Sequence, residues 1–147
     1  MKIYFAGPLF NEAEKKFNQN LTEKIESVGF DVFLPQRDGI ELSKSSGDLI
    51  KLDEKKREIF NLDRDKILDA DIFLFVLDGR EPDEGACVEL GIAYTQKYIG
   101  NKKKKLIGFH TDSRAAFVGS KLNPMIEVPL DYITDNEEEL IKLLRME

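Results

Sequence analysis

Short apolar runs alternate along this chain with longer amphipathic segments. A short apolar run that is closed by turn-forming residues is typical of a strand buried on both faces of a parallel sheet. The clearest run is at residues 72–77, where Asp78 and Gly79 close it. Comparable runs stand at residues 2–6, 30–34, 106–109 and 130–133, so the pattern predicts five strands.

The segments between these strands have the period of an α-helix. In residues 11–28, Phe17, Leu21, Ile25 and Val28 fall at helical spacing, which predicts an amphipathic helix. Further helices are predicted at residues 52–69, at 85–94 after a start at 82–84, and at 136–146, the last with Asp135 as its cap. Residues 35–39 are predicted as a turn, and 40–49 and 110–125 as polar or irregular connections.

Strands that alternate with helices form βαβ units, whose crossovers are right-handed. The sequence therefore predicts an α/β fold: a doubly wound, mostly parallel five-stranded sheet flanked by helices, in a flavodoxin-like or Rossmann-like three-layer sandwich. At 147 residues without an internal repeat, we expect a single domain over residues 1–147. A lone Gly7 follows the first strand, so a glycine-rich loop for a dinucleotide or a nucleoside triphosphate is disfavoured.

Two carboxylates interrupt helical faces that are otherwise apolar. Glu89 has Gly85, Ala86, Ile92 and Ala93 as its helical neighbours three and four positions away. A carboxylate in such surroundings is costly to bury unless it is hydrogen-bonded. Glu89 therefore either has a chemical task or lies on the single exposed face of a core helix.

Asp63 is the second of these carboxylates. It lies four residues from both Ile59 and Ile67, on the stripe that is expected to face the core. It either pairs locally with Arg64 or Lys66, or contributes a carboxylate to a pocket.

The carboxyl ends of all strands in a parallel sheet lie at one edge, where open α/β folds bind ligands. We expect this edge to bring together Tyr4, Gln36, Asp63, Asp83 and Glu89. Three carboxylates suit either a magnesium ion or acid chemistry at an anomeric carbon. The Tyr4 hydroxyl could supply a hydrogen bond to Glu89, and Asp83, at a helix start, is equally suited to be a helix cap.

Composition narrows the classes of partner. The net charge of −6 argues against nucleic acid and against an anionic membrane surface. A single histidine, His110, excludes a multi-histidine metal site, and a single cysteine, Cys87, excludes an intrachain disulfide. No apolar run approaches the roughly 20 residues of a membrane span. The chain begins directly as a strand without a basic-then-apolar leader, so the cytoplasm is the expected compartment.

Several short motifs occur in order along most of the chain. They are Ile-Tyr-Phe-Ala-Gly-Pro-Leu-Phe at residues 3–10, Asn-Leu-Asp at 61–63 ahead of Ala-Asp-Ile at 70–72, and Leu-Asn-Pro-Met at 122–125. The most specific is Pro-Asp-Glu-Gly-Ala-Cys-Val-Glu-Leu-Gly-Ile-Ala at residues 82–93. In this order, the sequence resembles the nucleoside 2-deoxyribosyltransferase family.

The resemblance implies chemical roles for four of the residues. Glu89 matches the catalytic nucleophile, and Tyr4 matches a tyrosine that positions it. Asp63 and Asp83 match acids that hold the nucleobase and assist its protonation.

The resemblance also implies a substrate site that two subunits share. Gln36 falls where the family contacts the base, and Gly7 and Phe10 are expected nearby, although Phe10 suits core packing equally well. Asn123 and Met125 match residues that a neighbouring subunit lends to the pocket, the asparagine to the sugar. The chain is therefore expected to form a homo-oligomer, a dimer or a larger assembly.

The implied reaction is a retaining double displacement that belongs to nucleotide salvage and needs no cofactor and no metal. Glu89 would attack C1′ of a 2′-deoxynucleoside while an acid protonates the departing base, and a free nucleobase would then attack the glycosyl ester. A nearby carboxylate would stabilise the oxocarbenium-like transition state. The preference for purines or pyrimidines stays open.

Other functions fit the same pattern. A hydrolase of 2′-deoxynucleoside 5′-monophosphates would need a phosphate site. Arg37 or Arg114 could supply it, although Asp83 and the first loop would repel the phosphate. A non-catalytic nucleotide-binding module on the same fold would tolerate the loss of Glu89. A magnesium-dependent phosphatase or receiver is disfavoured because no acid ends the first strand.

Overall fold

The computed structural model describes residues 1–40, 49–112 and 122–146. Its centre is a sheet of five parallel strands in the order β2-β1-β3-β4-β5. This is the flavodoxin-like order, so the predicted fold class is confirmed. The strands are β1 (Lys2–Ala6), β2 (Asp31–Phe33), β3 (Ile72–Val76), β4 (Lys105–Phe109) and β5 (Tyr132–Thr134).

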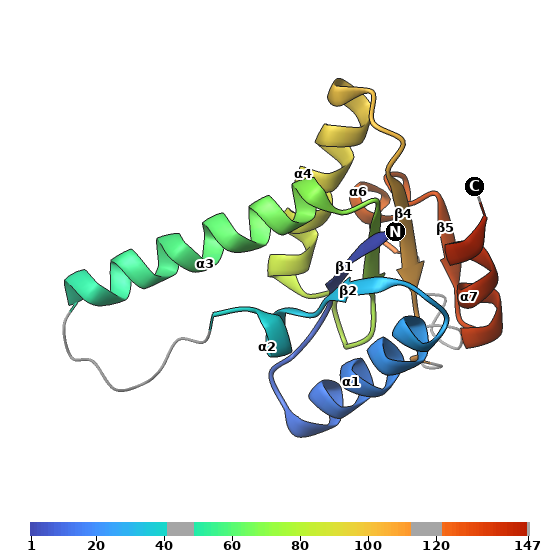
Figure 1. Ribbon diagram of the computed structural model, residues 1–147, viewed down its shortest axis with the longest axis horizontal. Helices are drawn as coiled ribbons and strands as arrows, with labels where there is room; N and C mark the ends of the chain where they lie inside the picture. The colour runs from blue at the N-terminus through green and yellow to red at the C-terminus, as the bar shows by residue number, and fades with distance from the viewer. Residues whose placement is uncertain (41–48, 113–121, 147) are drawn as a thin grey trace.

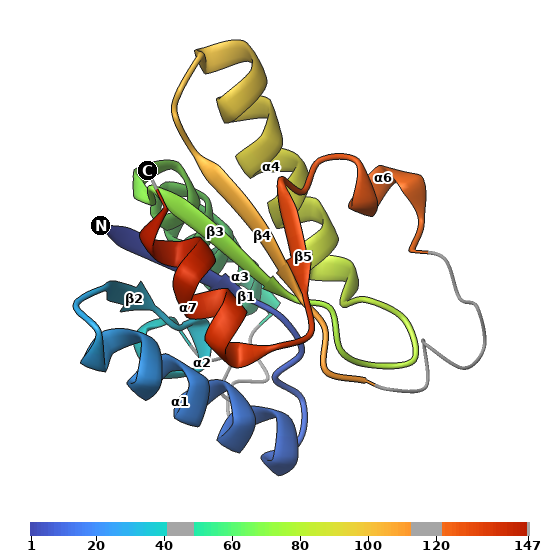
Figure 2. The same cartoon turned by 90° about the vertical axis from the view of Figure 1, so that its right-hand side faces the viewer.

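Helices cover both faces of this sheet (Figure 2). One face is covered by α1 (Glu12–Ser27) and α7 (Glu137–Arg145), whose Leu21, Ile25 and Leu140 pack with Ile3 and Leu74 of the strands. The other face is covered by α3 (Leu49–Asp69) and α4 (Glu84–Gly100). A short helix, α2 (Pro35–Asp38), lies in the segment that was predicted as a turn, and another, α6 (Pro124–Glu127), begins at the end of the segment that was predicted as an irregular connection.

Side chains of a strand point alternately to the two faces, and this alternation places Tyr4. Ile3 and Phe5 pack under α1 and α7, whereas Tyr4 and Ala6 pack with residues of α3 and α4. The tyrosine therefore lies on the same side of the sheet as the two helices that carry Asp63 and Glu89.

The end of β1 requires a glycine. A Cβ built on Gly7 would lie 2.9 Å from the Cβ of Val76, the last residue of β3. That separation is shorter than carbon atoms tolerate, so only glycine allows the first loop to leave the sheet beside β3.

The C-terminus of α3 is fixed to the body by a buried lysine. Lys104 is only 4% exposed, and its ammonium group donates hydrogen bonds to the carbonyl oxygens of Ile67 and Ala70. Cations are favourable at this end of a helix because its last carbonyls have no partners within the helix. The contact holds the part of α3 that carries Asp63 against the sheet.

Some boundaries differ from the predictions because caps decide them. The helix expected at residues 85–94 continues to Gly100 and ends at Asn101, whose φ of 47° is left-handed. Asn136 caps the last helix through the Glu139 amide, so the prediction that Asp135 would be its cap was wrong. Strands β2 and β5 each have three residues and are shorter than predicted.

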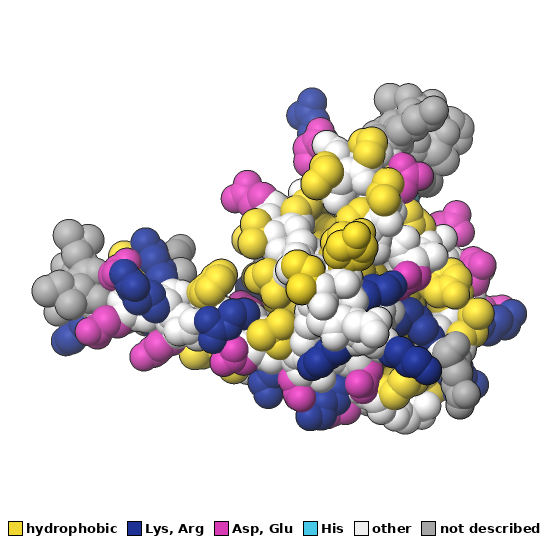
Figure 3. All heavy atoms as spheres, turned by 90° about the horizontal axis from the view of Figure 1, so that it is seen from above, with side chains coloured by type: hydrophobic (Ala, Val, Ile, Leu, Met, Phe, Trp, Pro, Cys, Tyr) yellow, Lys and Arg dark blue, Asp and Glu magenta, His cyan; other side chains and the backbone are white. Residues whose placement is uncertain are grey.

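The N-terminal half of α3 projects from the body as an arm (Figure 1). Charged side chains follow this arm, whereas hydrophobic side chains gather on the body in the view from above (Figure 3). Within the described part of the chain, no helix combines the length and the apolar character needed to span a membrane.

Candidate functional site

A small hollow of about 130 Å³ lies at the carboxyl edge of the sheet. We call it the acid pocket, because three of the residues that line it are carboxylates. The first loop after β1 supplies one wall, the start of α2 a second, and α3 and α4 the acids. Its lining consists of Ala6, Gly7, Leu9, Phe10, Pro35, Asp63, Asp83 and Glu89.

Tyr4 lies beneath this pocket and donates a hydrogen bond to Glu89. The distance from its hydroxyl to Oε1 of Glu89 is 2.8 Å. Its ring is fully buried between Phe33 and Phe73, whose ring centroids lie 5.6 and 5.8 Å away in stacked orientations. Burial and the neighbouring Glu89 carboxylate raise the pKa of Tyr4, so its hydroxyl keeps its proton at neutral pH and can donate to Glu89.

Glu89 itself favours the protonated form. Burial raises its pKa, the hydrogen bond from Tyr4 opposes this, and the negative charges of Asp63 and Asp83 add to it, with a result of about 8. The alternative that Glu89 lies on an exposed face of a core helix does not hold, because its carboxylate is hydrogen-bonded inside the fold.

Asp63 reaches the same pocket from α3. Burial raises its pKa to about 6. Local pairing with Arg64 does not occupy it, because the Arg64 guanidinium binds Asp65 and Asn61 instead. The pocket therefore holds two acids whose pKa values are both raised, and of the two Glu89 is the one that is mainly protonated at neutral pH.

The Asp83 side chain both caps a helix and lines the acid pocket. One oxygen, Oδ1, accepts a hydrogen bond of 2.8 Å from the Ala86 amide and so caps α4. The same side chain lines the acid pocket. The structural and the chemical interpretation of Asp83 are therefore compatible.

The first loop is fixed by side chains of α1 that the sequence analysis did not single out. Glu14 accepts hydrogen bonds from the amides of Phe10 and Asn11, and Asn18 donates to the carbonyl of Pro8 at 2.9 Å. Glu14 is readable in the sequence as the second member of an Asn-x-x-Glu capping box. Phe10 lines the pocket and is 75% exposed, so core packing is not its role.

The other three predicted substrate residues do not line the acid pocket of this chain. The amide of Gln36 is turned to α1, where it bonds Asn18 and the carbonyl of Lys15. Asn123 caps α6 through the Met125 amide, and Met125 is 80% exposed.

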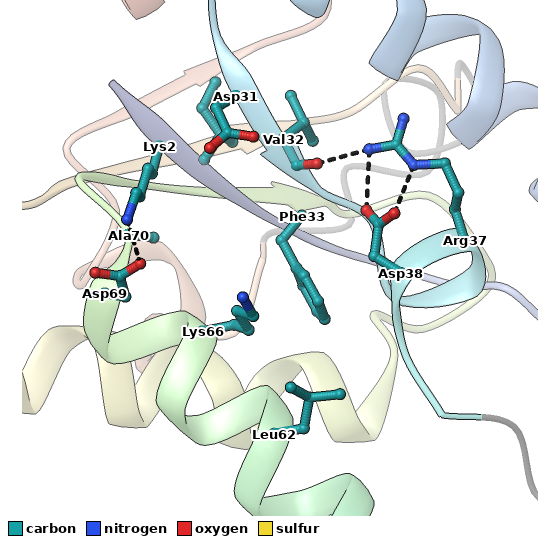
Figure 4. Close-up of a pocket in the computed structure, with 11 residues that line it drawn as sticks. Lys2, Asp31, Val32, Phe33, Arg37, Asp38, Leu62, Lys66, Asp69 and Ala70 are labelled. Carbon is teal, nitrogen blue, oxygen red and sulfur yellow. Dashed lines mark hydrogen bonds and ion pairs between the residues drawn. The ribbon is translucent and has the colours of Figure 1, made fainter.

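A second, larger hollow of about 480 Å³ lies between the edge strand β2 and α3 (Figure 4). An ion pair of Lys2 with Asp69 stands at one end and an ion pair of Arg37 with Asp38 at the other, with Phe33 between them. None of the three acids of the acid pocket lines this second hollow, so the larger of the two hollows is not the one that holds the candidate catalytic acids.

The second hollow also locates Arg37, one of the two candidates for a phosphate site. Its guanidinium binds Glu26, Asp38 and the carbonyl of Val32, and it does not line the acid pocket. The other candidate, Arg114, lies outside the described residues. In residues 1–40, 49–112 and 122–146, no group of three or more histidine, cysteine, aspartate or glutamate side chains is arranged to hold a metal ion.

Comparison with known proteins places this chain in a family. The model of the family described as nucleoside 2-deoxyribosyltransferase matches residues 3–144. A conserved protein from Enterococcus faecalis V583 superposes with a TM-score of 0.75 at 26% identity, over 99% of this chain and 97% of that one. A 2-deoxyribosyltransferase from Bacillus psychrosaccharolyticus superposes with a TM-score of 0.73, also at 26% identity, over 96% and 90% of the two chains.

A more distant structure shares the fold. The CMP N-glycosidase of Clostridium botulinum superposes with a TM-score of 0.53 at 22% identity, over 98% of this chain and 97% of that one. A sequence search of the curated proteins gave no significant match.

Proposed function

The chain belongs to the nucleoside 2-deoxyribosyltransferase family, and we propose that it moves a deoxyribosyl group from a 2′-deoxynucleoside to a second nucleobase. The observation that carries this proposal is the hydrogen bond of 2.8 Å from Tyr4 to Glu89 beside two further acids. It puts a carboxylate that can act as a nucleophile next to groups that can hold a proton. The fold and the identity shared with the Bacillus psychrosaccharolyticus enzyme support the same class of reaction.

The first step forms an ester on Glu89. A carboxylate oxygen attacks C1′, the bond from C1′ to the base nitrogen breaks, and its electron pair leaves with the base. Asp63 or Asp83 gives the departing base a proton, and the remaining carboxylate stabilises positive charge on the sugar. Tyr4 holds the attacking carboxylate in place from below.

The second step reverses the first with a new base. A ring nitrogen of the incoming base attacks C1′, the ester bond breaks, and Glu89 leaves as a carboxylate. The base loses a proton to the acid that had given one, so the site returns to its starting state. Water in place of the base would release free deoxyribose, which is hydrolysis of the same intermediate.

We further propose that a second subunit contributes residues to the acid pocket. Asn123 and Met125 do not line the acid pocket of their own chain, and α6 exposes Met125 and Val128 to solvent. Both features suit a homo-oligomer in which one subunit offers these side chains to the pocket of the next. The reaction is assigned to a single domain over residues 1–147.

The central test is a base-exchange assay followed by chromatography. The protein is incubated with a 2′-deoxynucleoside and a different free base, and in parallel with a 2′-deoxynucleoside 5′-monophosphate. A new deoxynucleoside in the first reaction supports the transferase. If base is released only in the second reaction, the transferase proposal is contradicted and the monophosphate hydrolase is favoured. If neither reaction gives a product, a binding module is favoured.

The proposed covalent intermediate on Glu89 can be tested directly. Glu89→Gln keeps the size of the side chain and removes the nucleophile, so turnover should be lost while folding is retained. Mass spectrometry of the protein quenched during turnover should find one deoxyribosyl group on the peptide that contains Glu89. Undiminished base exchange by Glu89→Gln would end this assignment.

Mixing two inactive variants tests the shared site. Asn123→Ala and Glu89→Ala are unfolded together and refolded, so that mixed oligomers form. If sites are shared, some pockets of a mixed oligomer receive an intact Glu89 and an intact Asn123, and activity returns. If each chain builds its own site, every pocket carries one defect and activity stays low.

A further inference from the structure

Asn18 lies on the buried face of α1 and bonds two separate segments with one nitrogen. It is 2% exposed, and its Nδ2 donates to the carbonyl oxygen of Pro8 at 2.9 Å and to Oε1 of Gln36 at 3.0 Å. A side-chain amide nitrogen has two hydrogens, so both are used. Asn18 is not among the residues that line the acid pocket.

The two segments that Asn18 joins are two walls of the acid pocket. Pro8 lies between Gly7 and Leu9, which line the pocket from the first loop, and Gln36 follows Pro35, which lines it from the start of α2. The Gln36 amide is fixed from its other end as well, because its Nε2 donates to the Lys15 carbonyl at 2.8 Å. The buried amide of Asn18 therefore joins the two walls directly, and contacts of Glu14 and Lys15 hold each wall to α1 separately.

An apolar residue would serve the helix better than asparagine at this position. Asn18 is three residues before Leu21 and seven before Ile25, on the apolar stripe of α1, and its Oδ1 has no hydrogen-bond partner in the described part of the chain. A buried acceptor without a partner destabilises a fold, so packing gives no reason for an amide here. The reason lies with its nitrogen, which joins the walls.

We propose that Asn18 is a positioning residue that sets the gap between the first loop and α2, and thereby the fit of the nucleobase. This rests on the proposed function, with the sugar at Glu89 and the base taken to lie between Gly7 and Phe10 of the first loop and Pro35 of α2, which line the acid pocket. Asn18 acts through Pro8 and Gln36 and does not touch the substrate. Its loss should therefore change the discrimination between bases and leave the ionisation of Glu89 as it is.

Two variants of Asn18 and one neighbouring control test the inference. Asn18→Leu suits the apolar stripe but cannot donate, and Asn18→Asp keeps the shape while it places carboxylate oxygens against two acceptors. The control is Thr22→Val, one turn along α1, which removes an equally buried hydroxyl that has no partner in the described part of the chain. Asn18→Ser replaces the leucine variant if circular dichroism finds that variant unfolded.

The first measurement is hydrogen exchange by mass spectrometry, which needs no turnover. The amides of Phe10 and Asn11 in the first loop and those of Arg37, Asp38 and Gly39 in α2 should exchange faster in Asn18→Leu than in Thr22→Val. Equal exchange in the two proteins would overturn the bridging role, whether or not the protein is an enzyme.

The second measurement is kcat/KM for a purine and for a pyrimidine acceptor. Misplacement of a substrate wall by about 1 Å can cost about a hundredfold, so the Asn18 variants should lose tenfold to a hundredfold, unequally for the two bases. Thr22→Val should keep the wild-type ratio, and the pH dependence should not move in any of them. Equal losses for both bases would contradict a role of Asn18 in the discrimination between bases and would leave it a purely structural role. Absence of turnover in the wild type would refute the proposed function alone, since hydrogen exchange would still decide the bridge.

Discussion

Removal of the Tyr4 hydroxyl should change the pH at which Glu89, the proposed nucleophile, becomes ionised. In Tyr4→Phe the ring stays stacked between Phe33 and Phe73, so the change is confined to one oxygen atom. The hydroxyl donates a hydrogen bond of 2.8 Å to the Glu89 carboxylate. This hydrogen bond lowers the pKa of Glu89, whereas burial and the charges of Asp63 and Asp83 raise it. The variant should therefore raise the pKa of Glu89 above its value of about 8.

The size of the effect follows from the strength of the bond. A hydrogen bond to a charged group contributes about 1.5–3 kcal/mol. One pKa unit corresponds to about 1.4 kcal/mol, so the pKa of Glu89 should rise by about one to two units. At pH 7 the ionised fraction would fall by about tenfold to a hundredfold, and kcat/KM should fall with it.

The assay is the pH dependence of kcat/KM for base exchange. The limb that reports ionisation of Glu89 should move to higher pH in Tyr4→Phe, and part of the lost activity should return in alkaline buffer. Tyr94→Phe is the matched control: it removes a hydroxyl from a tyrosine of the same helix as Glu89, one that stacks on Tyr98. Carbon-13 NMR of the glutamate carboxyls, assigned with Glu89→Gln, measures the same pKa without turnover. If the limb stays at the same pH and activity falls equally at every pH, the hydrogen bond from Tyr4 does not set the pKa of Glu89.

Three further predictions concern the acids and the buried lysine. Asp63→Asn should remove a limb near pH 6 from the kcat/KM profile and lower the pKa of Glu89, because the Asp63 charge raises it; an unchanged profile would exclude Asp63 as the proton donor. Asp83→Asn should keep the fold, since asparagine caps helices as well as aspartate, and should slow base departure more than it weakens sugar binding; equal effects on both would count against an acid role. Burial lowers the pKa of Lys104 to about 8, below its unfolded value, so protonation is less favourable in the folded protein than in the unfolded chain, and stability decreases as the pH falls from 10 to 8 even though the ammonium keeps its two hydrogen bonds. The free energy of unfolding in urea should therefore rise between pH 8 and pH 10 in the wild type relative to Lys104→Met, and parallel curves would contradict this.

The sheet was predictable because each strand is a short apolar run, whereas the helices between the strands show a periodicity of about 3.6 residues in their apolar positions. Residues 72–77 and 2–6 are followed by glycines at a turn, and both became strands at the predicted places. Boundaries were less predictable because caps compete locally. Asp135 and Asn136 are adjacent and both can cap a helix, and only the position of the chain before α7 decides that Asn136 does so.

Two acids of the acid pocket could be singled out in the sequence for a physical reason. A carboxylate on an apolar stripe is costly to bury, so Asp63 and Glu89 stand out against their helical neighbours. The same rule extends to uncharged polar residues such as Asn18, which interrupts the stripe of Leu21 and Ile25. The direction of the Gln36 amide could not be read from the chain, because it depends on a rotamer set by contacts with α1.

The proton count of the acid pocket bears on how the proposed reaction begins. With pKa values of about 6 for Asp63 and about 8 for Glu89, the pair holds about one proton at neutral pH, mainly on Glu89. The reaction needs the opposite arrangement, an ionised Glu89 and a protonated acid beside the base. Moving the proton against a difference of roughly two units costs about 2.7 kcal/mol, which lies well within the barrier of an enzymatic step. The Tyr4 hydroxyl reduces this cost because it stabilises the ionised carboxylate, and a bound base that accepts the proton reduces it further. In the proposed mechanism the pocket would thus supply both the nucleophile and the proton for the first step in one ionisation state, and Tyr4 would lower the cost of the exchange between them.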